Sequence, residues 1–251
     1  MNAYLLSHNG LGDNITMIGA VNFLLQYYVK IYFICKKKYE TNVKLLYNND
    51  NVILIPINEY NEYNECKNII NNVNKLTSDI FICGHCHTSH LSSHITNVNI
   101  LNHNKNNINI KYTHIFNFYN CIGLDTNIYV NYFNIESTPT SIDYYNKINK
   151  YKIIFMHTQG SNRSINTSNI NNLFINNSEY IIICSNKNMY NTDNIHYELA
   201  NTYVNLPITY YIDIIKKSTE IHVLDSCFSC IVYPLQLSGV LNNTVIKIYE
   251  L

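Results

Sequence analysis

Short apolar runs alternate with longer segments of helical period along most of the chain, and this alternation constrains the fold more than any other feature. Runs such as Val52 to Ile57 are continuously apolar, which is typical of strands buried on both faces of a parallel sheet. The expected strands are Ala3–Ser7, Ile31–Cys35, Val52–Ile57, Asp79–Cys83, Lys152–His157, Tyr180–Cys184, Glu220–Leu224 and Thr244–Ile248. The pattern predicts an α/β chain with two Rossmann-like, doubly wound domains.

Helical segments separate these strands, and one polar stretch divides the chain. The expected helices are Asn14–Tyr28, Lys37–Tyr47, Glu59–Leu76, Ile115–Ile122, Ile208–Lys217 and Ser226–Leu237. Thr138-Pro139-Thr140 and the Asn- and Lys-rich residues 146–150 are typical of a linker, so we expect domains at 1–145 and 146–251. Ligands of open α/β sheets bind at the carboxyl ends of the strands, so we expect the two domains to face a ligand-binding cleft.

Charge and hydropathy exclude several classes of partner. The 251 residues include 17 basic and 17 acidic side chains, and no basic track is visible, so we expect no nucleic-acid partner. No window of about 18 apolar residues occurs, which argues against a membrane span. The first residues lack a basic stretch followed by a long apolar one, so we expect no secretory signal and a cytoplasmic protein.

Amino-acid usage bears on redox state and on source. The eight cysteines are expected to be reduced thiols, and most of them, such as Cys35, Cys83, Cys184 and Cys227, fall in or beside apolar runs where core packing is the default. Heavy use of Asn, Ile, Tyr and Lys without any Trp is typical of an AT-rich genome, for instance that of a parasite or a large DNA virus.

A glycine turn follows the first expected strand. Gly10 and Gly12 allow a sharp turn and a close ligand approach, and a helix is expected to begin near Asn14. Asp13 lies at the mouth of this turn, where a carboxylate acts either as a helix cap or as a functional group. Because a carboxylate is poorly suited to receive a phosphate, we expect Gly10, Gly12 and Asn14 to line the acceptor side of the cleft.

A second strand-to-helix turn, Leu224 to Ser229, mirrors the first. Ser226 is a good N-cap, and its hydroxyl, the Cys227 backbone and the following N–H groups are typical of a pocket for a diphosphate. The alternative is that Asp225 and Ser226 only cap the helix.

A polar loop, His157 to Ser164, follows the first strand of the second half. Arg163 stands at the carboxyl end of that strand, where its guanidinium can pair with a phosphate in bidentate fashion. Gly160 and the hydroxyls beside Arg163 favour a close ligand approach. The alternative is an arginine in an exposed loop.

The stretch from Cys83 to His90 contains cysteines and histidines that suit three interpretations. Cys83, Cys86, His87 and His90 are ligand types for tetrahedral zinc, but no second paired cluster lies at a standard distance. His85, His87 or His90 can instead line an acceptor cleft, or the residues can belong to a plain loop.

Three familiar enzyme signatures are missing. The chain has no Gly-x-x-x-x-Gly-Lys-Ser/Thr loop, and Gly10-Leu11-Gly12 lacks the third glycine of the dinucleotide fingerprint. It also has no Gly-x-Ser-x-Gly elbow, which argues against an esterase.

Three short motifs resemble a known family. Gly10 to Ile15, followed by Ile18 to Val21, and the second turn from Ile221 to Ser226 resemble GT-B glycosyltransferases of the ADP-heptose–lipopolysaccharide heptosyltransferase type. The motifs occur in that family's order, across both halves. At the second turn the family has Asp-Thr-Gly followed by His, where this chain has Asp225-Ser226-Cys227 without the histidine.

The resemblance implies inverting transfer of a sugar from a nucleotide-diphosphate donor to a hydroxyl of a glycan or other acceptor, without a metal or other cofactor. Asp13 corresponds to the general base that deprotonates the acceptor hydroxyl. The residues expected around the departing diphosphate are Arg163, Ser161, Ser164, Ser226, Cys227 and Ser229. The departures at the second turn leave one alternative open, a non-catalytic protein that keeps the GT-B fold and binds nucleotide sugars or glycans.

Overall fold

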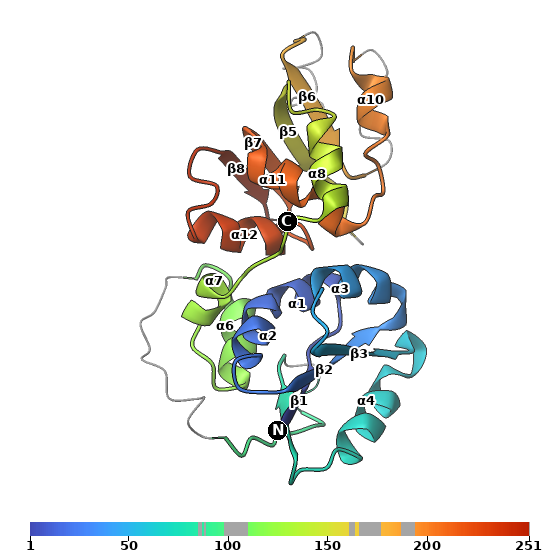
Figure 1. The fold of residues 1–251 in the computed structure, drawn as a ribbon, viewed down its shortest axis with the longest axis vertical. Coiled ribbons are helices and arrows are strands. Elements are labelled where there is room, and N and C mark those ends of the chain that lie inside the picture. Colours follow the sequence, from blue (N-terminus) through green and yellow to red (C-terminus); the bar gives the residue numbers. More distant parts are fainter. Residues whose placement is uncertain are drawn as a thin grey trace. The chain divides into compact units, whose positions relative to one another are not determined.

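A computed structural model of the chain consists of two compact units, Met1–Asn134 and Ile135–Leu251, whose elements are labelled in Figure 1. The structure describes residues 1–84, 87, 89–97, 110–160, 164–165, 177–186 and 194–250. Each unit contains a four-stranded sheet in which every strand pairing is parallel. The α/β class predicted from the apolar runs is confirmed.

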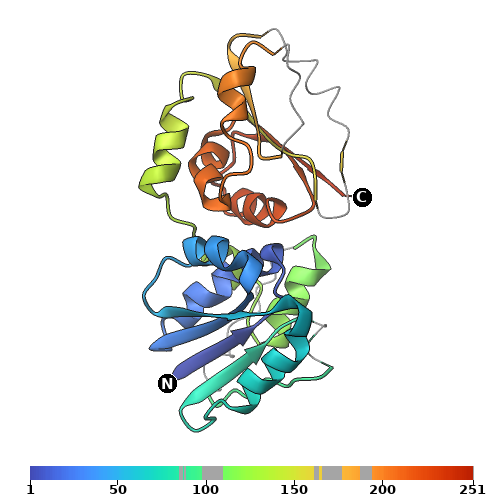
Figure 2. The same cartoon turned by 90° about the vertical axis from the view of Figure 1, so that its right-hand side faces the viewer.

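In the sheet of unit 1, successive strands are added on one side of the first strand and then on the other. Its strands are β1 (Asn2–Leu6), β2 (Lys30–Lys36), β3 (Val52–Ile57) and β4 (Ser78–Ile82). Their order is β3-β2-β1-β4, and Figure 2 shows these blue and teal strands side by side. The chain therefore crosses back over the sheet between β3 and β4, which makes β1/β4 the switch point where ligands of such sheets bind, beyond the carboxyl ends.

Short helices follow the strands of unit 1. They are α1 (Leu11–Thr16), α2 (Ile18–Leu24), η1 (Lys37–Tyr39), α3 (Glu40–Leu46), η2 (Glu59–Asn61), α4 (Glu62–Asn71), α6 (Thr113–Cys121) and α7 (Asn127–Asn131). The long first helix expected over Asn14–Tyr28 is corrected in two respects. It begins earlier, at Leu11, and it is divided at Met17.

A tyrosine from a distant helix causes that division. The hydroxyl of Tyr119 in α6 donates to Thr16 O at 2.9 Å and accepts from Ala20 N at 3.1 Å, so it replaces the hydrogen bond that an unbroken helix would form between these two groups. Gly19 makes room, because a Cβ there would lie 2.9 Å from the Tyr119 hydroxyl and 2.6 Å from Ile128 O. A side chain inserted into the helix thus sets the bend between α1 and α2.

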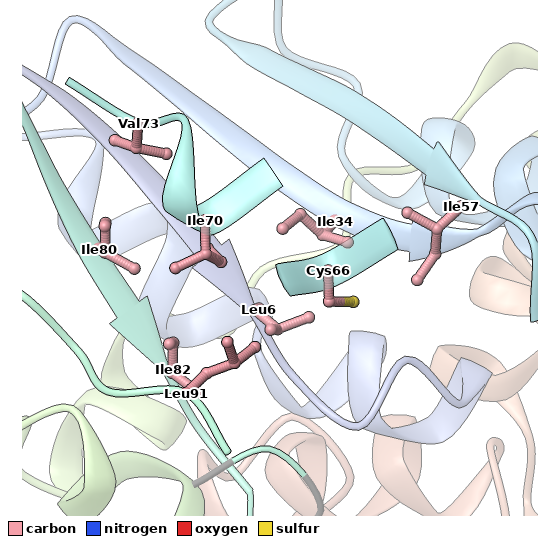
Figure 3. Packing of buried hydrophobic residues seen from close by; sticks show 9 residues of the cluster. All are labelled: Leu6, Ile34, Ile57, Cys66, Ile70, Val73, Ile80, Ile82 and Leu91. Carbon is pink, nitrogen blue, oxygen red and sulfur yellow. The ribbon is translucent and has the colours of Figure 1, made fainter. Parts of the chain in front are cut away.

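Helix α4 covers one face of the unit 1 sheet. Cys66 and Ile70 of this helix are buried against side chains from β1, β2 and β4, as Figure 3 shows. The buried members of this cluster are Leu6, Ile34, Ile57, Cys66, Ile70, Val73, Ile80, Ile82 and Leu91. Burial of this apolar surface fixes α4, and with it the polar residue Glu62 at its start, over the carboxyl ends of the strands.

Unit 2 repeats the arrangement with a different strand order. Its strands are β5 (Lys152–His157), β6 (Tyr180–Cys184), β7 (Glu220–Leu224) and β8 (Val245–Tyr249). The order β6-β5-β7-β8 places the switch point between β5 and β7. The helices are α8 (Pro139–Asn146), α10 (Tyr197–Asn201), η4 (Ile208–Tyr211), α11 (Ile212–Lys217) and α12 (Ser229–Leu237).

The division between the units lies after Asn134, earlier than the expected position at residue 145. The linker prediction is partly wrong, because residues 139 and 140 belong to helix α8. Thr138 caps this helix by accepting a hydrogen bond from Ser141 N at 3.0 Å. Asp213 of α11 accepts hydrogen bonds from the hydroxyls of Ser137 and Ser141. These contacts make α8 part of unit 2.

The described helices are all short. The longest, α4, has 10 residues, whereas crossing the hydrocarbon core of a bilayer takes about 20. Within the described part of the chain, no helix is long and apolar enough to span a membrane.

Candidate functional site

The turn after β1 is formed by Asn9 and Gly10 together. Asn9 adopts a left-handed conformation with φ of 60°, so an asparagine takes the strained position and neither predicted glycine does. Gly10 has an ordinary φ of −71° and forms the N-cap of α1. Its role is steric, because a Cβ at Gly10 would lie 2.5 Å from Oδ2 of Asp13.

Asp13 closes this turn. It is the third residue of α1, and its Oδ2 accepts a hydrogen bond from Gly10 N at 3.0 Å. A third-residue acid that receives the N-cap N–H is a known stabiliser of helix starts, so the capping interpretation of Asp13 is confirmed. The side chain is half-buried. Within the described part of the chain Oδ1 has no partner, and the base role stays a prediction.

The other residues expected on the acceptor side differ in exposure. Gly12 is half-buried, and its carbonyl accepts from the hydroxyl of Thr16 at 3.0 Å. Asn14 is fully buried, its backbone carbonyl accepts from Tyr47 Oη at 2.5 Å, and its side-chain amide has no partner among the described residues. The structure thus places Asn14 inside unit 1 and leaves Gly10, Gly12 and Asp13 at the partly exposed turn.

A polar cluster that the sequence analysis missed lies beside this turn. Glu62 at the start of α4 accepts from Asn9 Nδ2 at 3.0 Å and forms an ion pair with Lys36 Nζ at 2.9 Å. His87 Nε2 lies 3.5 Å from the same carboxylate. Asn9 follows β1, Lys36 ends β2 and His87 follows β4, so the only signal for this cluster was that each residue stands at or just after a strand's carboxyl end.

Two protonation states follow from this cluster. Burial acts to raise the pKa of Glu62, but hydrogen bonds from Lys36 and Asn9 outweigh it and hold that pKa below its usual value. Burial lowers the pKa of His87, although the nearby Glu62 acts in the opposite direction. The cluster therefore contains an ionised carboxylate and, at neutral pH, an uncharged imidazole.

The cysteine and histidine stretch is only partly described. His85 and Cys86 lie outside the described residues, and His87 is buried against Glu62. Cys83 is fully buried, its Sγ donates to Leu6 O at 3.2 Å, and burial raises the pKa of its thiol well above the usual value. Among the described residues, no group of three His, Cys, Asp or Glu side chains is arranged to hold a metal ion.

In unit 2, a histidine and a serine meet at the switch point. His157 ends β5, and its Nδ1 lies 2.9 Å from the hydroxyl of Ser226, which follows β7. The ring of Phe228 packs on the imidazole with centroids 4.7 Å apart. Burial lowers the pKa of His157 to about 4, so the imidazole is uncharged at neutral pH.

The second turn differs from its prediction, since α12 begins at Ser229 and not at Ser226. The Ser226 hydroxyl contacts His157 instead of capping the helix, and the N-cap residue is Phe228. Ser229 Oγ accepts from Ser226 N at 3.0 Å and lies 3.0 Å from Asp225 Oδ1. Cys227 is half-buried, and burial raises the pKa of its thiol to about 11, so it is an uncharged group here.

The loop after β5 is held by an amide from the loop after β6. Asn186 Oδ1 accepts from Thr158 N at 2.9 Å and from Gln159 N at 3.2 Å. The exposed residue Ser164 pairs with Gln159 in a short antiparallel bridge. Ser161 and Arg163 lie outside the described residues, so their expected contact with a phosphate stays a prediction.

Comparison with known proteins adds a likeness of fold. No protein-family model and no curated protein matches the sequence. Among solved structures, a glycosyl transferase family 9 protein from Veillonella parvula matches at a TM-score of 0.53 and 13% identity, covering 99% of this chain and 86% of that one. ADP-heptose lipopolysaccharide heptosyltransferase II from E. coli matches at a TM-score of 0.57 and 8% identity, covering 100% and 91%.

The chain has the GT-B fold. Since the matches cover both units, the fold expected from the motifs at residues 10–15 and 221–226 is confirmed. At identities of 13% and 8%, the likeness is one of fold. Both solved proteins come from bacteria and give no support to a viral source.

Proposed function

We propose that the chain is a glycosyltransferase that moves a sugar from a nucleotide-diphosphate donor to a hydroxyl of an acceptor. The GT-B likeness across both units carries this proposal. The chemistry of the two turns supports it, because the switch point of unit 1 offers a half-buried carboxylate and that of unit 2 brings a serine hydroxyl to an uncharged histidine. The heptosyltransferase II named above is an ADP-heptose enzyme, and for this chain we propose the donor class alone.

In the proposed reaction, the acceptor hydroxyl oxygen attacks the anomeric carbon of the donor, and its proton passes to Asp13. The bond between that carbon and the diphosphate oxygen breaks, and the nucleoside diphosphate leaves with the electron pair. Attack from the side opposite the leaving group inverts the configuration. A positioned base of this kind contributes about 10²- to 10⁴-fold to the rate.

The departing diphosphate needs groups that stabilise negative charge. We assign this role to unit 2, where the Ser226 hydroxyl lies beside an uncharged histidine in the turn that leads into α12. Arg163, Ser161 and Ser164 complete the proposed diphosphate site. With these groups in place, the reaction is proposed to run without a bound metal ion.

The test is release of nucleoside diphosphate from a panel of nucleotide sugars supplied with hydroxyl acceptors. Asp13→Asn keeps an oxygen that can accept from Gly10 N, so the variant should fold while losing the base. Asp143→Asn, which alters an exposed ion pair with Lys147 in α8, is the matched control and should keep wild-type turnover. Wild-type rates in Asp13→Asn would rule out the base assignment, and turnover abolished by EDTA would rule out the metal-free route.

One observation favours a second function, binding without catalysis. The Asp13 carboxylate already serves α1 as a capping group, so its presence is explained without a reaction. A rise in melting temperature with nucleoside diphosphates, together with no turnover of any donor, would favour this alternative.

A further inference from the structure

A charged residue at the start of α4 holds the left-handed conformation of Asn9 in the turn before α1. Asn9 is fully buried, and its side-chain Nδ2 donates to Glu62 Oε1 at 3.0 Å. Its own N–H donates to the hydroxyl of Ser7 at 3.3 Å. Asparagine enters this conformation more readily than most non-glycine residues, so the hydrogen bonds that Asn9 makes decide how firmly the turn is held. The hydrogen bond to the Glu62 carboxylate is the strongest of them, because the carboxylate is ionised.

Glu62 is in turn fixed from two sides. Lys36 Nζ lies 2.9 Å from Oε2, so each carboxylate oxygen has its own partner. His87 Nε2 lies 3.5 Å from Oε1 and forms no hydrogen bond within the described part of the chain. The apolar side of α4 is anchored by Cys66 and Ile70 in the core (Figure 3). The position of the Glu62 carboxylate is therefore set by the sheet, through Lys36, and by the packing of α4. It does not depend on the turn itself.

The residue after Asn9 connects this carboxylate to Asp13. Gly10 N donates to Asp13 Oδ2 at 3.0 Å, and the direction of that N–H depends on the peptide that joins Asn9 to Gly10. If Asn9 leaves its left-handed conformation, that peptide rotates and the hydrogen bond to Asp13 is lost. The orientation of the Asp13 carboxylate thus depends on Glu62 through two consecutive hydrogen bonds.

We propose that Glu62 is a positioning residue that holds the Asn9–Gly10 turn and thereby aims the Asp13 carboxylate. This inference rests on the proposed function for its effect on turnover, but its effect on the turn can be measured without any substrate. Lys36 keeps Glu62 ionised and in place, and Asn9 transmits its position. None of these three residues needs to touch a substrate.

The test compares Glu62→Ala, Glu62→Gln and a control on the same helix. Glu62→Ala removes both acceptors, whereas the Glu62→Gln carboxamide oxygen can still accept from Asn9. Glu65→Gln is the matched control, since Glu65 also accepts a backbone hydrogen bond, from Asn58 N at 2.9 Å, but does not contact the turn. Two quantities are measured in each variant: amide hydrogen exchange at Gly10 without substrate, and the separate kcat and donor KM values.

We expect Glu62→Ala to raise the Gly10 exchange rate by about tenfold or more, because a hydrogen bond to a charged group is lost. The turnover number should fall by a similar factor with donor KM unchanged. Glu62→Gln should show a smaller change in both quantities, and Glu65→Gln none. Unchanged exchange in the amides of β2 shows that the sheet of unit 1 remains folded in the variants.

Several outcomes would overturn the inference. Wild-type exchange at Gly10 in Glu62→Ala would show that the turn does not depend on the carboxylate. Equal effects in Glu62→Ala and Glu62→Gln would point to a role of charge alone and not of position. An inactive wild-type protein would instead refute the proposed function, while the exchange measurement would still decide whether Glu62 holds the turn.

Asn9→Gly provides an independent variant. Glycine adopts a positive φ without strain but has no amide for Glu62, so the turn should survive as one of several backbone conformations. We expect faster Gly10 exchange and a lower kcat than in the wild type, with no added effect of Glu62→Ala in the double variant. Additive effects of the two substitutions would show that Glu62 does not act through Asn9.

Discussion

The turn after β1 and the turn after β7 both lie at the switch point of a four-stranded parallel sheet, yet opposite kinds of chemical group close them. In unit 1, Gly10 N donates to the carboxylate of Asp13. In unit 2, Ser226 N donates to the hydroxyl of Ser229, and the Ser226 hydroxyl contacts an uncharged histidine. The carboxylate of the first turn accepts a backbone N–H directly, whereas the carboxylate of the second turn, that of Asp225, lies 3.0 Å from the Ser229 hydroxyl that closes the turn.

This difference shows that the order of the strands determines where each turn lies, whereas the side chains determine which chemical groups it contains. A carboxylate in the first turn repels a phosphate but can take a proton, whereas hydroxyl and N–H groups at the second turn can stabilise a diphosphate. The same backbone plan, used twice, therefore carries a different set of side chains in each unit. Substitutions that remove this chemical contrast should have separable effects.

The largest expected effect is on the kinetics of paired variants in the two turns. Asp13→Asn should lower kcat by about 10²- to 10⁴-fold and leave donor KM unchanged, because it removes a base. Ser226→Ala should raise donor KM by about tenfold, because it removes a hydrogen-bonding group proposed to face the diphosphate. Steady-state kinetics with varied donor measures both. If both variants change the same constant, the proposed division of roles between the turns is wrong.

The next effect is a pH dependence of unit 2. The pKa of His157 is about 4 when folded, against an ordinary value of 6.5, so between these values the unfolded chain binds a proton that the folded unit does not. The free energy of unfolding of unit 2 should therefore fall by about 3 kcal/mol as the pH drops from 6.5 to 4. Denaturant titrations at several pH values measure this loss.

His157→Gln should reduce that dependence, because one shifted imidazole is gone, and the remainder should come from His222, whose pKa burial also lowers. His114→Gln, at an exposed position in unit 1, serves as the control and should leave the pH dependence of unit 2 unchanged. Parallel curves for His157→Gln and the wild type would show that another group is responsible.

A smaller effect is expected from Ser229, whose hydroxyl links both ends of the second turn. Ser229→Ala leaves Ser226 N and Asp225 Oδ1 without this partner, which should lower the free energy of unfolding of unit 2 by about 1–2 kcal/mol. Thermal and denaturant unfolding measure the change. Ser238→Ala, at the other end of α12, is the matched control, and an equal loss there would show that the turn itself is not the cause.

The smallest effect concerns the cap in unit 1. Asp13→Ala should lower the free energy of unfolding of unit 1 by about 1 kcal/mol through loss of the hydrogen bond to Gly10 N, whereas Asp13→Asn should keep most of that stability. Comparing the unfolding curves of the two variants separates the structural use of Asp13 from its proposed use in catalysis. Identical curves would show that the cap contributes nothing measurable.

The strands were predictable, because continuous apolar runs reflect burial, which is a property of each segment itself. All eight expected strands exist, with ends that differ by at most a residue or two. Helix starts were less predictable, since they depend on partners elsewhere in the chain. Ser226 has the composition of an N-cap, but His157 takes its hydroxyl and the helix begins three residues later, at Ser229.

In the candidate site, too, local features could be predicted from the sequence and contacts between distant residues could not. The two turns were visible in the sequence because each is a contiguous motif after an apolar strand. The contact between Asn9 and Glu62 was not visible, because 53 residues separate them and only the packing of α4 brings them together. His157 was noted as part of a polar loop, but its burial and its contact with Ser226 depend on the order of β5 and β7 in the sheet.

The Tyr119 hydroxyl between α1 and α2 has a consequence for how the protein is made. The bend behind the first turn depends on an atom that leaves the ribosome about a hundred residues after Gly10, as the separation of 103 residues between Tyr119 and Thr16 shows. A nascent chain that ends before α6 can pair β1 with β2 and β4, but it lacks the group that divides the helix. The first turn therefore reaches its final geometry only when unit 1 is nearly complete, which ties its assembly to the end of its own domain.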